Sequence, residues 1–267
     1  ILVVGSLVMD LTVSTEKFPS SGETVLGLGY KTAPGGKGAN QAIQAARLGA
    51  DVTMVGRVGN DEFGKVLISS CREAGIHTEF IGVDNSACSA IGNVQLEVKN
   101  DTTHNRIIVV SGANMSIKPE QVTFLRDSIS KFDMVMLQLE IPNQINEIIV
   151  DYAYKKHVPV MLNPAPSAKL SEKLLSHLSY ISPNEHEAED LTGIHIRKEG
   201  KQVNMDDVHR AAQAFLNYGV KNVVITLGSA GAVIANKNDF FYEPCADVVN
   251  VKDPTAAGDS FVGAFSV

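Results

Sequence analysis

The chain has 267 residues, 44% of them hydrophobic, which is enough for the core of one large α/β domain or of two small ones. Its net charge of −7 argues against nucleic acid or an anionic membrane as the main partner. No apolar run approaches the ~18 residues of a membrane span, and the opening run Ile1–Ser6 is expected to be a core strand and not a signal peptide. The three cysteines form no C-x-x-C pair, so we expect free thiols and a cytoplasmic protein.

Apolar strand-like runs alternate with helical patterns along the chain, which favours a mostly parallel sheet with helices on both faces, an α/β fold. The predicted strands are Leu2–Val4, Val52–Val58, Met134–Leu139, Val158–Leu162, Tyr180–Ser182 and Val223–Leu227. The predicted helices are Ala39–Leu48, Asp61–Ala74, Pro119–Ser130, Ile145–Lys155, Glu185–Leu191 and Asp206–Tyr218. Residues 11–33 and 91–110 alternate apolar and polar side chains, and they predict antiparallel strands outside the main sheet, with a turn at Asn100-Asp101. The segment Arg197–Lys201 is expected to be a solvated loop.

A glycine cluster, Gly35-Gly-Lys-Gly-Ala-Asn40, separates a strand-like run from a helical pattern. Glycines let the backbone approach a polar ligand, and Lys37 and Asn40 supply hydrogen-bond donors. The cluster is not a Walker A loop, because position 31 is a lysine and Gly38 follows Lys37. An ordinary glycine turn is the alternative.

A second cluster, Asp253-Pro-Thr-Ala-Ala-Gly-Asp259, stands just before an apolar helical pattern. The free N–H groups and the macrodipole of a helix start attract phosphate, and the small residues 256–258 leave room for it. The negative charge of Asp259 would weaken anion binding there, so we expect this residue to have a catalytic role. That role is to accept a proton from an attacking hydroxyl. The alternative is a capped helix start, with Asp253 as the cap and Gly258 as an accommodation to packing.

These two clusters together resemble the signatures of the ribokinase-like carbohydrate kinase family. Further landmarks match in order along essentially the whole chain: Gly5-Ser6, Asp10, Gly22-Glu-Thr24, Gly112-Ala-Asn114, Gln138-Leu-Glu140, Leu162-Asn-Pro-Ala-Pro166, Pro183-Asn-Glu-His-Glu187 and Ile225-Thr-Leu-Gly-Ser229. The resemblance implies one α/β domain over residues 1–267, with a small β lid from about 11–33 and 91–110 that covers a sugar and forms a homodimer. An ordinary extension of the main sheet is the alternative for those two segments.

The activity that the resemblance implies is ATP-dependent phosphorylation of D-ribose at its 5-hydroxyl. A deoxyribose, fructose or nucleoside kinase of the same fold is the alternative, although a nucleoside kinase needs an apolar, often aromatic base pocket and the chain has no tryptophan. An esterase built on Gly258-Asp-Ser260 would need a histidine and an aspartate partner, and a sugar sensor would need no base, so both are disfavoured.

The resemblance also assigns roles to single residues. Asp259 is implied as the catalytic base, beside an anion hole formed by Ala256, Ala257 and Gly258. The implied sugar contacts are Asp10, Gly35, Gly36, Lys37, Asn40 and Glu140, and the implied nucleotide contacts are Asn184, Thr226, Gly228, Ser229 and Gly231. Glu187 is implied to hold Mg²⁺ through water, and Asp253 and Thr255 are implied ligands of a monovalent cation, K⁺.

The residues themselves leave structural alternatives open for several of these positions. Asp10 can be a turn aspartate, Glu140 a salt-bridged structural carboxylate, and Asn184 with Glu187 a helix capping box. Residues 226–231 are expected to form a hairpin turn in either case. Two departures from the family pattern stand out: Val8 occupies a position where asparagine is common, and family members continue beyond Val267, so we expect a truncated carboxyl end.

Overall fold

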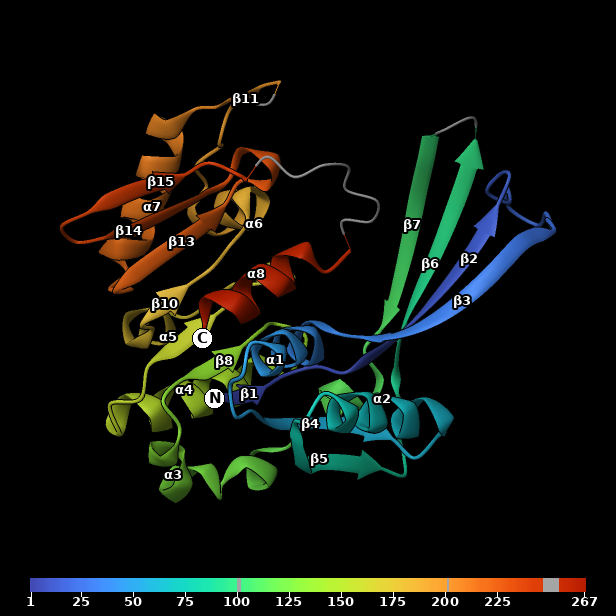
Figure 1. Cartoon of the computed structure of the whole chain (residues 1–267), viewed down its shortest axis with the longest axis horizontal. Coiled ribbons are helices and arrows are strands. Elements are labelled where there is room, and N and C mark those ends of the chain that lie inside the picture. Colours follow the sequence, from blue (N-terminus) through green and yellow to red (C-terminus); the bar gives the residue numbers. More distant parts are fainter. Residues whose placement is uncertain (100–101, 201, 247–254) are drawn as a thin grey trace.

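The computed structural model describes residues 1–99, 102–200, 202–246 and 255–267 (Figure 1). Within these ranges the main element is a nine-stranded sheet with the order β15-β14-β13-β10-β9-β8-β1-β4-β5. Its strands are β1 (Leu2–Val4), β4 (Thr53–Gly59), β5 (His77–Asp84), β8 (Val135–Leu137), β9 (Val160–Leu162), β10 (Tyr180–Ile181), β13 (Asn222–Thr226), β14 (Ala232–Asn236) and β15 (Phe240–Glu243). All pairs from β13 to β5 are parallel, and β14 and β15 add antiparallel strands at one edge. The predicted mostly parallel sheet is confirmed.

Helices cover both faces of this sheet, and successive residues of β1 show the division. Val3 packs into an apolar cluster beneath one set of helices, while Leu2 and Val4 pack into a second cluster on the opposite face. The first set is α1 (Lys37–Arg47), α2 (Glu62–Glu73) and α8 (Ala257–Phe265), and the second is α4 (Asn143–Lys155), α5 (Glu172–His177), α6 (Glu185–Thr192) and α7 (Met205–Asn217). A strand that is buried on both faces is the reason for the continuous apolar run at the start of the chain. Every helix in the described ranges is too short or too polar to span a bilayer.

A second, four-stranded sheet with the order β3-β2-β6-β7 projects from the main body beside α2 (Figure 1). Its strands are β2 (Val8–Thr15), β3 (Gly27–Gly35), β6 (Ala90–Lys99) and β7 (Thr102–Val110). We call it the small sheet. It contains the two predicted segments, but only two of its three strand pairs are antiparallel, because β2 and β6 run parallel. The predicted turn at Asn100-Asp101 lies outside the described residues.

Two sequence-based predictions of elements are wrong, the helix over residues 119–130 and the loop over residues 197–201. The expected helix over residues 119–130 is broken into a 3₁₀ turn (Pro119–Val122), the short α3 (Leu125–Ser128) and a further 3₁₀ turn (Ile129–Lys131). Hydroxyls compete with the helix there, since Thr123 Oγ1 donates to the carbonyl of Glu120 and Ser128 Oγ to that of Phe124. Strand β5 and helix α5 were not predicted at all.

The segment expected as a loop at Arg197–Lys201 instead contains β11 (Lys198–Glu199), which pairs antiparallel with β12 (Gln202–Val203), while Lys201 lies outside the described residues. Its anchor is Asp207 of α7, a fully buried carboxylate. Arg197 donates to both oxygens of Asp207, through Nε at 2.6 Å and Nη2 at 2.9 Å. A bidentate pair of this kind holds the hairpin against the helix.

Candidate active site

Several of the residues predicted for the site meet in one pocket of about 230 Å³. Its described lining consists of Lys37, Asn163, Ser182, Asn184, Glu187, Thr226, Ala256, Ala257, Gly258, Asp259 and Val262. Eight of these were predicted from the sequence: Lys37, Asn184, Glu187, Thr226 and the run from Ala256 to Asp259. The pocket lies beyond the carboxyl ends of β9, β10 and β13, where ligands bind in open α/β sheets.

Helix α8 begins with an open end at this pocket. Its N-cap residue, Ala256, has the left-handed φ of 58° and provides no side-chain cap. A Cβ built on Gly258 meets nothing within 4 Å, so packing against the described residues does not require a glycine there. The first N–H groups of a helix lack intrahelical acceptors, and the end of α8 can therefore offer them to an anion. The alternative cap, Asp253, lies outside the described residues.

Asp259, in the first turn of α8, is 8% exposed and is held by two amides of α1. Asn40 donates from Nδ2 to Oδ2 of Asp259 at 3.0 Å, and Gln41 donates from Nε2 to Oδ1 at 3.1 Å. The structure thus joins Asn40, a predicted sugar contact, directly to the predicted base. A carboxylate whose two oxygens accept N–H bonds is poised as a hydrogen-bond acceptor toward a hydroxyl.

Asp10 lies within β2, and two glycines of the neighbouring strands make room for its carboxylate. A Cβ at Gly35 of β3 would lie 2.7 Å from Oδ2, and a Cβ at Gly92 of β6 would lie 2.5 Å from Oδ1. Burial raises the pKa of Asp10, and the charges of Glu140 and Asp259 raise it further. Asp10 is therefore not a turn aspartate. Gly92 was missed in the sequence, where its only signal is its position within an alternating strand.

Glu140 follows β8 and binds the start of α1. Its Oε2 accepts a hydrogen bond from Ser6 Oγ at 2.5 Å and another from the backbone N–H of Lys37 at 3.0 Å. Ser6 Oγ in turn accepts from the N–H of Gly38 at 3.2 Å. Glu140 thus has a structural partner in the glycine cluster itself, and it lies beside the predicted sugar residues.

The glycine cluster needs its glycines for close backbone packing. Gly36 has a φ of 94°, and its Cβ would lie 2.7 Å from the backbone N of Val8. A Cβ at Gly38 would lie 2.5 Å from the backbone N of Ser6. The buried side chain of Val8, 6% exposed, offers no polar group to a sugar. The cluster thus begins α1 in contact with the strand that carries Asp10.

Asn184 and Glu187 form the capping box of α6. Asn184 Oδ1 accepts from the N–H of Glu187 at 2.8 Å, and Glu187 Oε2 accepts from the N–H of Asn184 at 2.9 Å. Both side chains also line the pocket, so capping and ligand binding are compatible here. Burial raises the pKa of Glu187, against the opposing effects of the Asn184 N–H and of Lys37.

The turn after β13 contains the remaining predicted nucleotide residues. Thr226 pairs with Asn184 and lines the pocket. Gly228 and Gly231 have φ values of 59° and 111° in the turn that joins β13 to β14, so the predicted hairpin is confirmed. Gly228, Ser229 and Gly231 are not among the described pocket-lining residues. Thr255 is an exposed residue just before Ala256, and Asp253 is outside the described ranges.

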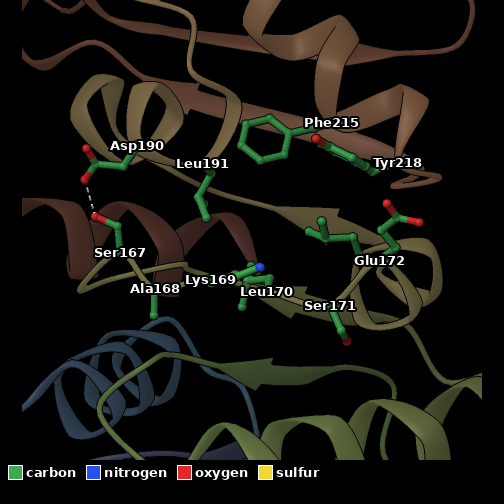
Figure 2. A pocket seen from close by; sticks show the side chains of 11 residues that line it. Ser167, Ala168, Lys169, Leu170, Ser171, Glu172, Asp190, Leu191, Phe215 and Tyr218 are labelled. Atoms are coloured by element: carbon green, nitrogen blue, oxygen red, sulfur yellow. Dashed lines mark hydrogen bonds between the residues drawn. The ribbon is translucent and has the colours of Figure 1, made fainter.

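A larger hollow, of about 560 Å³, lies between α5, α6 and α7 (Figure 2). Side chains from the loop before α5 line it together with Asp190, Phe215 and Tyr218, and Ser167 Oγ donates to Asp190 Oδ2 at its edge. None of the residues predicted for the site lines it. The smaller pocket is the candidate active site because it combines an open helix start, a cation and two carboxylates.

An α/β sheet with a helix start and an adjacent buried carboxylate at its carboxyl edge is the arrangement of a phosphotransferase that acts on a hydroxyl. Residues 1–267 match the pfkB family of carbohydrate kinases, and the chain belongs to this family of sugar kinases. It is 38% identical to the ribokinase of Bacillus subtilis over 267 residues, which cover 100% of this chain and 84% of that relative. The deoxyribokinase of Salmonella typhi is 32% identical, with the same coverage.

Among solved structures, the ribokinase of Arabidopsis thaliana complexed with ribose and ATP superposes with a TM-score of 0.88. It is 31% identical, and the match covers 99% of this chain and 84% of that one. The central sheet, its helices and the small sheet therefore recur in a ribokinase, which confirms the predicted fold class.

Proposed function

We propose that this chain transfers the γ-phosphoryl group of ATP to the 5-hydroxyl of D-ribose, giving ribose 5-phosphate and ADP. The observation that carries the proposal is the position of Asp259, in the first turn of α8 and hydrogen-bonded to Asn40 at 3.0 Å. One residue thereby faces both an anion-binding helix start and a predicted sugar contact. Relatives named ribokinase that match the whole chain support the choice of ribose.

In the proposed step, Asp259 accepts the proton of the 5-hydroxyl as its oxygen bonds the γ-phosphorus and the bond to the leaving oxygen of ADP breaks. Backbone N–H groups from Ala256 to Asp259 at the start of α8 stabilise the charge on the transferring group. Lys37 lines the same pocket and supplies a positive charge. Proton acceptance and anion stabilisation are thus assigned to a single turn of helix.

The proposed sugar site is formed by Asp10, Gly35, Gly36, Lys37, Asn40 and Glu140. Asp10 and Glu140 supply carboxylate oxygens, which accept hydrogen bonds from hydroxyls. The effect of Glu140 and Asp259 on the pKa of Asp10 supports a common cluster, because such effects require short distances. A sugar that donates several hydroxyls fits a cluster of carboxylates better than an apolar base does.

For the nucleotide we propose contacts from Asn184 and Thr226 in the pocket and from Gly228, Ser229 and Gly231 in the following turn. No described group of three or more His, Cys, Asp or Glu side chains is arranged to hold a metal. We propose that Mg²⁺ is held mainly by phosphates and water, with Glu187 as the nearby carboxylate. When bound, Mg²⁺ would neutralise charge on the phosphates. The K⁺ site at Asp253 and Thr255 is proposed from the sequence resemblance alone.

A panel of sugars assayed with ATP tests the substrate. We expect the highest kcat/KM with D-ribose, a lower value with 2-deoxyribose, and lower values still with fructose and adenosine. Deoxyribose is the serious competitor, because a deoxyribokinase matches the full chain and Val8, where asparagine is common in the family, offers a sugar no polar group. A higher kcat/KM with deoxyribose would replace ribose in the proposal, and no turnover of any free sugar would refute it.

We further propose that residues 1–267 act as one domain and that the small sheet is a lid over the sugar and the interface of a homodimer. Apolar side chains remain exposed on it, including Leu28, Tyr30, Ile107 and Ile108. Ile107 and Ile108 are neighbours on β7 and face opposite sides of the sheet. Sedimentation equilibrium should therefore show a dimer that Ile107→Asp with Ile108→Asp dissociates, whereas Leu48→Asp at the end of α1 should leave it intact. A monomeric wild type would refute the interface.

A further inference from the structure

Three buried amide side chains form a hydrogen-bonded group at Asp259, and one of them, Asn163, also lines the pocket. They are Gln41 of α1, Gln138 after β8 and Asn163 after β9. Gln41 and Gln138 are fully buried, and Asn163 is 8% exposed. Gln138 and Asn163 stand within landmarks of the sequence and Gln41 directly follows the glycine cluster, but the proposed reaction gives none of the three a role. Burying a polar side chain costs free energy unless hydrogen-bond partners are positioned to receive it, so we expect this group of amides to have a function.

Gln41 is the centre of this group. Its Nε2 donates to Asp259 Oδ1 at 3.1 Å and to Asn163 Oδ1 at 3.1 Å. Its Oε1 accepts from Gln138 Nε2 at 2.7 Å. One amide thus connects the proposed base to two loops at the carboxyl edge of the main sheet.

Groups that can only accept fix the direction of these bonds. The backbone carbonyl of Ser182 accepts from Asn163 Nδ2 at 2.8 Å, so Asn163 must turn its Oδ1 toward Gln41. Asp259 as a carboxylate also needs a donor, so Gln41 must present its NH₂ group to both and its Oε1 to Gln138. The orientation of the Gln41 amide is therefore fixed by the partners of its Nε2 and by the partner of its Oε1.

The cost of this arrangement appears at Gln138. Because its NH₂ group serves Gln41, its Oε1 is buried without a hydrogen-bond partner among the described residues. An orphaned buried acceptor destabilises the fold, and the opposite orientation would place two carbonyl oxygens against each other. The orientation of Gln138 is thus imposed by Gln41 and, through it, by Asp259.

The two oxygens of Asp259 consequently have different surroundings. Oδ1 is bound by the buried Gln41, whereas Oδ2 is bound by Asn40, which is only partly buried and is a proposed sugar contact. Asn40 can turn to a sugar hydroxyl when the substrate binds, but Gln41 has no such freedom. Oδ2 is therefore the oxygen that becomes available for a proton.

We propose that Gln41 is a positioning residue for Asp259, which holds Oδ1 so that Oδ2 takes the proton of the sugar hydroxyl. The inference rests on the proposed role of Asp259 as the base. In the step, the O–H bond of the hydroxyl breaks, its oxygen bonds the γ-phosphorus, ADP leaves with its bridging oxygen, and the proton goes to Oδ2. Gln41 touches none of the reacting atoms.

The first test is Gln41→Leu, which keeps the approximate size of the side chain and removes the donor. We expect kcat to fall about 100-fold, since an error of about 1 Å in the position of a catalytic group has an effect of that size. The KM values for ribose and ATP should stay within about threefold, because Gln41 contacts neither substrate. The matched control is Gln44→Leu, one turn further along α1 and partly buried, which should keep wild-type kcat.

The second test is Gln41→Glu, which places a carboxylate against Oδ1. Two carboxylates at this distance resist ionising together, so the acidic limb of the kcat–pH profile should move to higher pH. The other charged groups near Asp259 in the described residues, Lys37 of α1, Glu187 of α6 and Asp10 of β2, are unchanged in this variant. Gln44→Glu adds the same charge to the same helix and should leave the limb in place.

Wild-type kcat in Gln41→Leu, together with an unmoved acidic limb in Gln41→Glu, overturns the inference. If Gln41→Leu does not fold, Gln138→Met decides: a fall in kcat at constant KM supports positioning through Gln41, and an unchanged kcat refutes it. Asp259→Asn separates the two proposals. An inactive Asp259→Asn beside an active Gln41→Leu overturns only the role of Gln41, whereas an active Asp259→Asn overturns the base itself.

Discussion

Gly35 and Asp10 are in contact across the β2–β3 pair, and a Cβ at position 35 would lie 2.7 Å from Oδ2 of the carboxylate. Side-chain carbon and oxygen atoms do not approach this closely, so any larger residue at position 35 must displace Asp10. The first glycine of the cluster therefore has its effect on the sugar side of the site, through the carboxylate, and not through a contact with phosphate.

Gly35→Ala is accordingly expected to raise KM for ribose and to leave KM for ATP unchanged. A displaced hydrogen bond to a charged group costs about 1.5–3 kcal/mol, which corresponds to a rise of tenfold or more. The matched control is Gly29→Ala on the same strand, where an added Cβ meets nothing within 4 Å among the described residues. Initial rates with each substrate varied in turn measure both constants. An equal rise in KM for ribose and for ATP would show that the contact between Gly35 and Asp10 supports the fold and not sugar binding.

Asp259→Asn tests the base. We expect kcat to fall by at least about 100-fold, because the amide cannot accept the proton. Isothermal titration should show ribose affinity close to that of the wild type. The control is Asp206→Asn, another acid in the first turn of a helix, but exposed on α7. A variant that keeps a tenth of wild-type kcat would remove Asp259 from this role.

Gly263→Ala tests the contact that sets Asp259 against α1. A Cβ at position 263 would lie 2.6 Å from the carbonyl oxygen of Gln41 and 2.8 Å from Cβ of Gln44. Overpacking of this kind costs about 1–3 kcal/mol, so the free energy of unfolding should fall by that amount in a urea titration. We also expect kcat to fall at constant KM, since α8 must move away from the amides that hold Asp259.

Ala264→Ser, on the exposed side of α8, is the control for this change. It should alter neither the free energy of unfolding nor kcat. A stable Gly263→Ala variant with wild-type kcat would show that α1 and α8 can separate without displacing the carboxylate.

The strands of the core could be predicted from the sequence because they are buried on both faces. Leu2–Val4 and Val160–Leu162 are apolar throughout, and no helical pattern competes there. Strand β5 escaped prediction because it lies at the edge of the sheet, where most of its residues from His77 to Asp84 are partly or fully exposed. The broken segment after Lys118 was mispredicted because hydroxyl-to-carbonyl bonds depend on local geometry that apolar spacing does not record.

In the site, Asp259 and the helix start before it were predictable, because small residues and a carboxylate stand together in one short motif. The task inferred for Gln41 was not predictable, since its partners come from residues 138, 163 and 259, which only the folded sheet brings together. A signal did exist: Gln138 and Asn163 each follow an apolar strand, and polar residues at strand ends cluster at one edge of a parallel sheet. The same argument would have pointed to Ser182 after β10.

Glu187→Gln is expected to change stability in a pH-dependent way. Burial raises the pKa of Glu187 above the ordinary glutamate value of about 4.3, with smaller opposing effects from the Asn184 N–H and Lys37. The protonated Glu187 side chain therefore contributes fully to the stability of the wild type below the pKa of the unfolded state. The wild type loses this contribution as pH rises through the pKa of the folded state. Glutamine does not titrate and still offers an oxygen to the N–H of Asn184. The variant should therefore gain stability relative to the wild type as pH rises from the ordinary glutamate value through the raised folded value.

Urea denaturation of the nucleotide-free protein at a series of pH values measures this difference. Glu62→Gln, an exposed acid in the first turn of α2, is the control and should not become more stable than the wild type as pH rises. Addition of Mg²⁺ with ADP should make the wild type more stable than Glu187→Gln. A ligand that binds only the folded state stabilises it more, the tighter it binds. The carboxylate proposed to hold Mg²⁺ through water is missing from Glu187→Gln. Equal stabilisation of both proteins by Mg²⁺ and ADP would leave Glu187 with its capping role on α6 and no part in binding the metal.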